Sequence, residues 1–207
     1  AGKDTVCVLT NMNQPIGYSV GNSLEVIEAV DALNGNMKED VKEIVLSLGS
    51  YMIKLAGKGD NIEENKKMIL ENINNKKALN KFRELVQNQG GDVSYIDDIS
   101  KFEKAKFILP VTSEKSGYIK SMNNEKIGFI SCKLGAGRMT KEDKINNKVG
   151  IIINKKIGDK VEVGDILGYI HSDNENIGNE AVEELKECYE FSVDFVQKEK
   201  HILGIVK

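Results

Sequence analysis

Three cysteines and two histidines are the residues of this chain best suited to nucleophilic, redox or metal chemistry. The cysteines, Cys7, Cys132 and Cys188, are odd in number, far apart and set among apolar neighbours. This arrangement is typical of buried thiols rather than of a disulfide framework or a metal site. The two histidines are isolated, and we expect His171, which closes an apolar run, to be structural. Neither residue type predicts a catalytic cluster.

The segment LGAGR, residues 134–138, invites comparison with glycine-rich loops that bind phosphate. It is short, and no Lys-Ser or Lys-Thr pair follows it. Such a pair supplies the ammonium and hydroxyl groups that those loops need. The segment therefore does not predict a phosphate-cradling loop, and we do not expect Arg138 to be catalytic.

A third pattern, KKIGDKVEVGDILGYI at residues 155–170, resembles the second hairpin of biotinyl and lipoyl carrier domains. Those domains present one lysine at an exposed turn a few residues after the hairpin. The stretch that follows here contains no lysine before Lys186. The segment thus has the carrier pattern without the carrier chemistry, and its Gly-Asp pairs are interpreted as chain reversals.

Composition limits the functional classes further. The chain has 207 residues, of which 40% are hydrophobic and 29% charged, with a formal net charge of −3. This charge gives no electrostatic reason to expect binding to nucleic acid or to an anionic membrane. No apolar run is long enough to span a bilayer, and no signal peptide opens the sequence. We therefore expect a cytoplasmic protein with no membrane partner.

The first hundred residues predict one strand and about four helices. Residues 5–10 form a β-branched apolar run typical of a buried strand in a parallel sheet. The helices are expected at residues 22–34, 36–56, 61–74 and 76–89, the first with an Asn22–Glu25 capping pair. No second strand follows nearby, and a lone buried strand would leave its backbone polar groups unsatisfied. Because the chain also begins AGKD, we interpret it as a fragment whose remaining sheet is missing.

After about Phe102 the pattern changes to short strands separated by Gly and Asp, as in a compact β-structure. We expect strands within residues 106–114, 117–122, 127–134, 150–158, 159–170 and 201–207, and one helix at about 180–189. The domain boundary is placed at residues 92–104. The predicted fold class is an α+β or α/β fragment with a mixed, β-rich second part.

Six ordered motifs carry a resemblance to a known family. They are TNMNQPIGYSVGNSLEVIEAVDAL, ALNKFRELVQNQGGD, SGYIKSM, LGAGRMTKEDKI, VGIIINKKIGDKVEVGDIL and NEN. In this order they resemble the C-terminal half of a pyrimidine-nucleoside phosphorylase of the thymidine phosphorylase family. The resemblance covers nearly the whole chain and weakens after about Glu187. It implies that residues 1–104 are the helical remainder of the α/β domain and residues 105–207 the C-terminal domain, with the carrier-like hairpin inside it.

The resemblance also implies an activity. Enzymes of this family use inorganic phosphate to cleave uridine, thymidine or deoxyuridine into the pyrimidine base and a (deoxy)ribose 1-phosphate, without an organic cofactor. They are pentosyltransferases and homodimers. In the family pattern, the phosphate loop and the Arg, Ser and Lys that hold the base precede the first residue of this chain. We therefore expect no catalytic residue here, and an inactive chain when it is alone.

The resemblance implies one inherited binding site, for a monovalent cation such as potassium. Its matching positions are the backbone carbonyls of Ile16 and Ser19 and the side chain of Glu28, in the loop and helix after the first strand. Without the resemblance, Glu28 would be interpreted as a solvated helix residue. Because further ligands would come from the missing half, the chain alone should bind the ion poorly.

The loop containing Gly135, Gly137 and Arg138 matches a mobile family loop that helps the interdomain cleft to close; an ordinary turn with a surface arginine is the alternative. Two other functions remain open. One is a carrier-like binding module, which the missing lysine disfavours. The other is a non-enzymatic assembly module from a split gene.

Overall fold

The computed structural model describes residues 2–206 and divides them into two compact units. Each unit combines segments that are far apart in the sequence. We call them the helical unit (residues 2–11, 29–99 and 200–206) and the β unit (residues 12–28 and 100–199). Within residues 2–206, no helix combines the length and apolar character needed to cross a lipid bilayer.

The helical unit contains the helices expected in the first half of the chain. Their bounds are α1 Asn22–Leu33, which ends in this unit, α2 Glu39–Leu55, α3 Ile62–Asn74 and α4 Lys77–Asn88. The unit also contains α5 Ser94–Asp97, which was not predicted, and a 3₁₀ turn Ile99–Lys101 begins at the last residue of its central segment. Helix α2 packs against α3, and α3 packs against α4. The Asn61 side chain accepts the backbone N–H groups of Glu63 and Glu64 at 2.9 and 3.2 Å, which fixes the start of α3.

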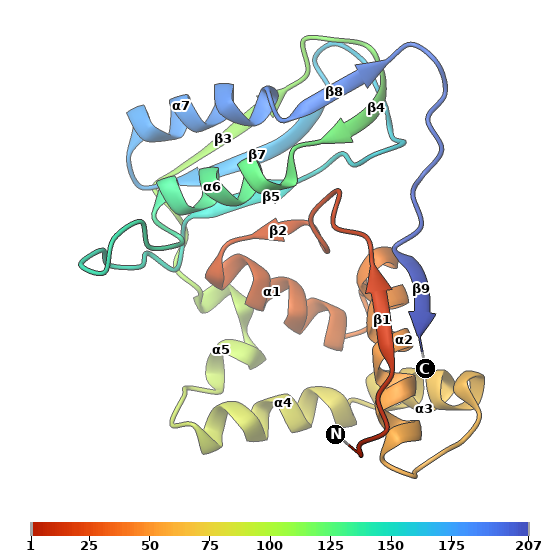
Figure 1. Cartoon of the computed structure of the whole chain (residues 1–207). Helices are drawn as coiled ribbons and strands as arrows, with labels where there is room; N and C mark the ends of the chain where they lie inside the picture. The colour runs from red at the N-terminus through yellow and green to blue at the C-terminus, as the bar shows by residue number, and fades with distance from the viewer. Residues whose placement is uncertain (1, 207) are drawn as a thin grey trace. The chain divides into compact units, whose positions relative to one another are not determined.

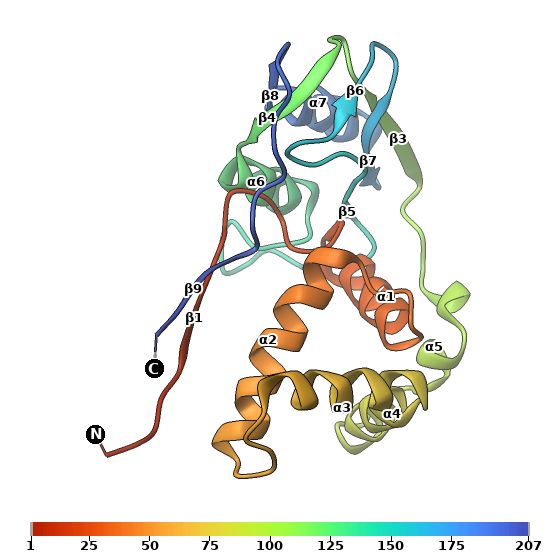
Figure 2. The same ribbon diagram turned by 90° about the vertical axis from the view of Figure 1, so that its right-hand side faces the viewer.

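The first strand differs from its prediction. Strand β1, Cys7–Thr10, pairs antiparallel with β9, Ile202–Val206, with Cys7 opposite Val206 (Figures 1 and 2). The Leu9 side chain is 52% exposed. The expectations of a buried strand, of a parallel sheet and of a strand without a partner were therefore wrong. The partner lies at the opposite end of the chain, where no local pattern could indicate it.

Two antiparallel sheets form the β unit. The larger has the order β2 (Ser19–Val20), β5 (Gly150–Ile153), β7 (Ile166–Ser172), β3 (Phe107–Thr112). The smaller has the order β6 (Lys160–Val161), β4 (Gly117–Met122), β8 (Tyr189–Ser192). Strands β6 and β7 flank the second Gly-Asp turn but belong to different sheets. The carrier-like hairpin is therefore not confirmed, because these two strands do not pair with each other.

Residues 127–134 are helical, so the strand predicted there was wrong. They belong to α6, Asn124–Leu134. Ile127, Ile130 and Leu134 are buried at helical spacing, whereas Phe129 between them is 59% exposed. The Asn123 side chain caps the helix by accepting the Lys126 N–H at 3.0 Å. The cluster of Ile and Phe suggested a strand, but the period of the buried positions and the cap favour a helix.

Helix α7, Glu175–Lys186, begins earlier than the predicted residues 180–189. The Asn174 side chain accepts the N–H groups of Asn176 and Ile177, which sets this start. Helix α7 packs on β3 and β7, and α6 packs on α7 and β5. The core of the β unit lies beneath them. It includes Val111, Ile119, Ile127, Val149, Ile151, Val161, Ile170, Ala181 and Leu185, each at most 1% exposed.

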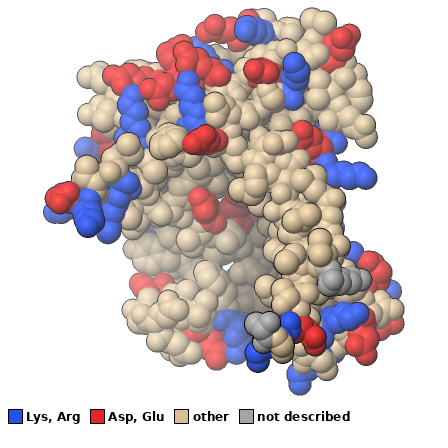
Figure 3. Space-filling view, viewed as in Figure 1, with Lys and Arg blue, Asp and Glu red and all other residues tan. Residues whose placement is uncertain are grey.

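Ion pairs link the outer faces of the two covering helices. Lys133 of α6 lies 2.9 and 2.8 Å from carboxylate oxygens of Glu180 and Glu184 on α7. Figure 3 shows acidic and basic side chains intermixed on the visible surface. Because these pairs are exposed, each contributes little to stability. The interleaved charges are accounted for by a solvated surface.

The cysteines are less uniform than expected. Cys188 is buried in the core of the β unit, where burial raises the pKa of its thiol to about 11. Cys132 is half-buried and Cys7 is exposed, so the expectation of buried thiols holds for one of the three. His171 is half-buried on β7, and burial lowers the pKa of its imidazole.

The packing of β7 leads to a stability prediction. Ile170→Ala should reduce the free energy of unfolding by about 2–5 kcal/mol, since it leaves a cavity at a fully buried position. Ile108→Ala on the neighbouring β3 removes the same atoms from a side chain that is 46% exposed, and should cost much less. Urea unfolding of both variants measures the difference. Equal losses would contradict the assigned core.

Candidate functional site

The carboxylate of Glu28 lies against the loop that precedes its own helix. The Tyr18 N–H donates to Oε1 and Oε2 of Glu28 at 2.8 and 3.1 Å, and the Ser19 N–H donates to Oε2 at 2.8 Å. Helix α1 therefore carries Glu28 to the point where the loop enters β2. Hydrogen bonds from consecutive backbone amides to a carboxylate are charge-assisted and stronger than neutral ones. This contact removes Glu28 from the class of simple solvated helix residues.

Gly17 makes this approach possible. Its φ of 71° lies in the left-handed region, which side chains other than glycine rarely adopt. A Cβ at this position would lie 2.9 Å from Glu28 Oε2 and 3.1 Å from its carboxyl carbon. The loop thus needs glycine both for its backbone conformation and for the space that the carboxylate occupies.

A carboxylate oxygen is a ligand type that hard cations accept. A carboxylate has about four lone-pair sites, so Glu28 keeps acceptor capacity beyond the contacts with Tyr18 and Ser19. Further oxygen ligands would have to come from backbone carbonyls of the loop, and those of Pro15 and Tyr18 already accept hydrogen bonds from Lys156 and Ile153. Across residues 2–206 there is no cluster of three or more His, Cys, Asp or Glu side chains that could hold a metal ion. A cation at Glu28 would therefore depend on backbone oxygens.

The structure brings Ser19 and Glu28 together, although through the Ser19 N–H rather than its carbonyl. Ser19 is buried and Ile16 is 44% exposed. The three predicted positions thus lie on one loop and the helix that follows it. Their roles as cation ligands stay a prediction.

Helix α1 begins differently from the prediction. Glu25 Oε1 accepts the Gly21 N–H at 2.9 Å, so the acidic residue caps the helix one residue earlier than expected. The Asn22 side chain instead donates to the Ala136 carbonyl at 2.7 Å. The start of the helix that carries Glu28 is therefore tied to the predicted closure loop.

That closure loop is locally ordered around two glycines and an aspartate. Gly135 ends α6 at a φ of 107°, and a Cβ on Gly137 would collide with Cys132 Sγ. Asp143 accepts the N–H groups of Met139 and Thr140, and the bond with Thr140 contributes most to lowering the pKa of this carboxyl. The Arg138 side chain is exposed. Internal hydrogen bonds therefore fix the conformation of this loop. Among the described residues, no contact indicates what Arg138 would bind.

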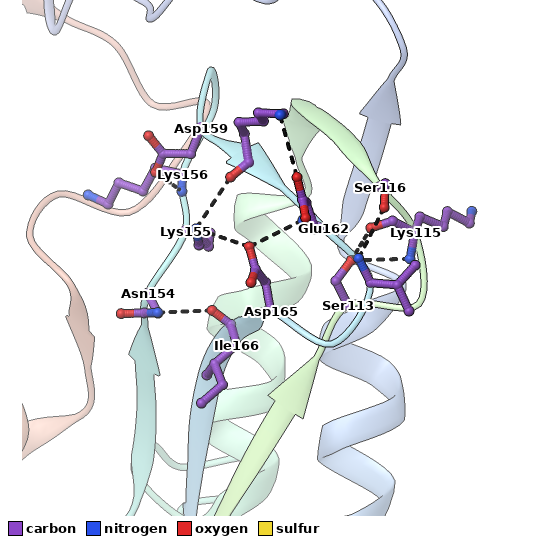
Figure 4. Close-up of polar contacts among 12 residues, drawn as sticks. Ser113, Lys115, Ser116, Asn154, Lys155, Lys156, Asp159, Glu162, Asp165 and Ile166 are labelled. Atoms are coloured by element: carbon purple, nitrogen blue, oxygen red, sulfur yellow. Dashed lines mark hydrogen bonds and ion pairs between the residues drawn. The ribbon is translucent and has the colours of Figure 1, made fainter.

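The second Gly-Asp turn is occupied by structural contacts (Figure 4). Asp165 accepts the Glu162 N–H at 3.2 Å and lies 3.5 Å from Lys155 Nζ. The backbone contact contributes most to lowering the Asp165 pKa. Asn154 donates to the Ile166 carbonyl at 2.9 Å on the adjoining strand. These contacts agree with the interpretation of the turn as a chain reversal.

Two residues at the loop were missed from the sequence, Gln14 and Lys156. Both are buried, at 8% and 6% exposure. Lys156 donates to the Pro15 carbonyl at 2.8 Å, and Gln14 accepts the Ile157 N–H at 3.0 Å. A Lys-Lys pair in a polar turn is typical of a solvated surface, so no local signal could have marked Lys156 as buried.

The seat of Glu28 leads to a second prediction. Gly17→Ala should destabilise the β unit by about 1–2 kcal/mol through backbone strain, and by about 1 kcal/mol or more through the disturbed Glu28 contacts. Gly164→Ala is the control, because Gly164 is also left-handed at φ 91° but a Cβ there meets nothing within 4 Å. Urea unfolding should show the larger loss for Gly17→Ala. Equal losses would mean that the Glu28 contact adds nothing.

Comparisons with known proteins show which proteins this chain resembles in sequence. Residues 118–192 match the family described as "Pyrimidine nucleoside phosphorylase C-terminal domain". Pyrimidine-nucleoside phosphorylases of Staphylococcus aureus strains USA300, NCTC 8325 and bovine RF122 are each 44% identical over 176 residues. The match covers 85% of this chain and 41% of each relative, so the chain spans about two fifths of their length. Over these residues the chain is similar to pyrimidine-nucleoside phosphorylases.

Proposed function

We propose that this chain is part of an enzyme that transfers the pentosyl group of a pyrimidine nucleoside to inorganic phosphate. The products would be the free base and a pentose 1-phosphate, and no organic cofactor would take part. The observation that carries the proposal is the 44% identity to proteins named pyrimidine-nucleoside phosphorylase over 85% of the chain. The complete reaction is proposed for the intact protein, which we infer to be a cytoplasmic homodimer.

The contribution of this chain, we propose, is the loop that holds a potassium ion. Glu28 would supply the charged ligand, and the carbonyls of Ile16 and Ser19 would supply neutral ones. A bound potassium ion would give a fixed positive charge that braces the phosphate-binding loop of the intact enzyme. The support from the structure is the fixed place of the Glu28 carboxylate, held by amides at 2.8 Å on the same loop.

The loop with Gly135, Gly137 and Arg138 would contribute to closing the active-site cleft of the intact enzyme. Its bond from Asn22 to the Ala136 carbonyl connects it to the start of α1, on which Glu28 lies. Movement of this loop would therefore change the position of helix α1 and of Glu28. The alternatives, a carrier-like module or a non-enzymatic assembly module, have no contact in the described chain that favours them.

An activity measurement tests the proposed reaction. The chain alone should release no uracil or thymine from uridine or thymidine with phosphate present, because the phosphate and base sites lie outside it. A hybrid should release free base when the preceding part of a Staphylococcus aureus relative is joined to Ala1. Turnover by the chain alone, or a folded hybrid without turnover, would contradict the proposal.

Potassium dependence tests the proposed role of Glu28. In the hybrid, Glu28→Gln should reduce the rise in melting temperature that potassium chloride produces over sodium chloride, since it removes the charged ligand. The effect is a binding linkage and should grow with potassium concentration.

Glu25→Gln is the matched control for this variant. Glu25 lies on the same helix, and its carboxylate caps Gly21. The Glu25→Gln variant should lower the melting temperature equally in potassium chloride and in sodium chloride. A potassium response that is identical in the parent hybrid and Glu28→Gln would exclude Glu28 as a ligand.

A further inference from the structure

Lys156 is a lysine buried within the β unit. Its residue is 6% exposed, and its Nζ atom lies 2.8 Å from the Pro15 carbonyl oxygen. The same atom lies 4.4 Å from the centre of the Tyr18 ring, the geometry of a cation–π contact. Burial of a charged group is costly unless polar partners receive it. Pro15 and Tyr18, on one loop, are among the partners that receive this one.

The backbone around Lys156 holds the same loop at further points. The Ile157 N–H donates to Gln14 Oε1 at 3.0 Å, and the Ile153 N–H donates to the Tyr18 carbonyl at 2.7 Å. Residues 153–157 thus contact the loop at Gln14, Pro15 and Tyr18. On the other side, the Tyr18 N–H contacts Glu28. Tyr18 is therefore fixed from both directions.

The turn that carries Lys156 is itself closed by internal contacts. The Lys156 N–H donates to Asp159 Oδ2 at 2.9 Å, and the Asp159 N–H donates to the Lys156 carbonyl at 3.0 Å. Gly158 supplies a left-handed φ of 87° between them. Lys198 Nζ lies 2.9 Å from Asp159 Oδ1. A turn closed in this way holds the Lys156 backbone in a defined place.

The orientation of Lys156 differs from that of its neighbour. Figure 4 shows Lys155 pointing into the group around Asp165, whereas Lys156 extends the opposite way, toward the pale red ribbon of the N-terminal segment. Lys155 pairs with Asp165 at 3.5 Å. The two adjacent lysines therefore serve different parts of the β unit, and Lys156 alone of this pair contacts Pro15.

We propose that Lys156 is a positioning residue for the loop that presents Glu28 and the candidate cation ligands. Its ammonium fixes the Pro15 carbonyl immediately before Ile16, and the Tyr18 ring immediately before Ser19. This holds the Tyr18 and Ser19 amides in register with the Glu28 carboxylate. Lys156 belongs to the segment whose sequence pattern resembles a carrier hairpin, and its side chain contacts the loop at Pro15 instead of projecting from an exposed turn. The cation part of the inference rests on the proposed function.

Lys156 has two opposite effects on a cation bound to this loop. Its charge repels the cation, while its contacts hold the loop ready for binding. A neutral side chain would relieve the repulsion and release the loop. We infer that the ordering effect dominates, because the Pro15 and Tyr18 contacts act directly on the residues next to the predicted ligands. The neutral variant should therefore bind potassium more weakly.

Amide hydrogen exchange of the 207-residue chain tests the positioning role without any cation. In Lys156→Met, the Tyr18 and Ser19 amides should exchange roughly tenfold faster or more, since a buried charge-assisted hydrogen bond is lost. Lys156→Arg keeps a charged donor and should restore much of the protection. Lys160→Met is the control, because Lys160 lies on the same segment and its side chain is 65% exposed. It should leave both amides unchanged.

A potassium titration of the same substitutions, made in the hybrid with the preceding part of a Staphylococcus aureus relative, tests the link to the cation. Melting temperature is followed with potassium chloride replacing choline chloride at constant ionic strength. The potassium concentration for half-maximal stabilisation should rise several-fold in Lys156→Met and return toward the parent value in Lys156→Arg. A merely structural role would lower all melting temperatures without changing that concentration.

The two measurements have separate outcomes. A parent hybrid without any potassium response would contradict the proposed cation site, while the exchange data would still decide the role of Lys156. Unchanged Tyr18 and Ser19 exchange in Lys156→Met, or no rescue by arginine, would overturn the positioning role. If Lys156→Met does not fold, Lys156→Gln against Lys156→Arg provides the same comparison. Failure of both to fold would also overturn the inference, because Lys156 would then serve the core as a whole.

Discussion

The contact between the Glu28 carboxylate and the backbone amides of Tyr18 and Ser19 is the constraint on which the site depends. It brings a helix side chain back onto the loop that precedes the helix. The chain can make this return because Gly17 leaves room for the carboxylate at a left-handed φ. Any ligand that uses Glu28 therefore meets a loop whose conformation is already set, which lowers the ordering cost of binding.

The β unit explains how such a short loop keeps its shape. Strand β2 pairs with β5, and the residues that follow β5 contact Gln14 and Pro15. The loop thus lies between α1 and the segment 153–157. A buried lysine needs polar partners in this position, and the Pro15 carbonyl and the Tyr18 ring are among those of Lys156.

Sequence reasoning captured the elements whose signals are local. Helices α2, α3 and α4 follow their apolar period, and α3 has an asparagine cap. Residues 127–134 were mistaken for a strand because β-branched and aromatic content outweighed the helical spacing of Ile127, Ile130 and Leu134. The partner of β1 could not be predicted, since pairing between the two ends of a chain leaves no local pattern.

The candidate site shows the same division. Glu28 was predicted as a cation ligand only because of the resemblance to a family. As a carboxylate on a helix, it would otherwise have been interpreted as a solvated residue. The structure adds the amide contacts that fix its place. Lys156 was missed because its burial depends on a loop 141 positions earlier in the chain. Long-range contacts of this kind separate a buried lysine from the many exposed ones.

Carbon NMR of the Glu28 carboxyl group in the hybrid during a potassium titration tests the central claim most directly. Choline chloride would keep the ionic strength constant, and Glu142, in the loop after Arg138, would report the general effect of salt. We predict a saturable shift of the Glu28 carboxyl carbon together with the Tyr18 and Ser19 amides, and no matching shift at Glu142. A Glu28 response that is linear in salt and equal to that of Glu142 would contradict the account.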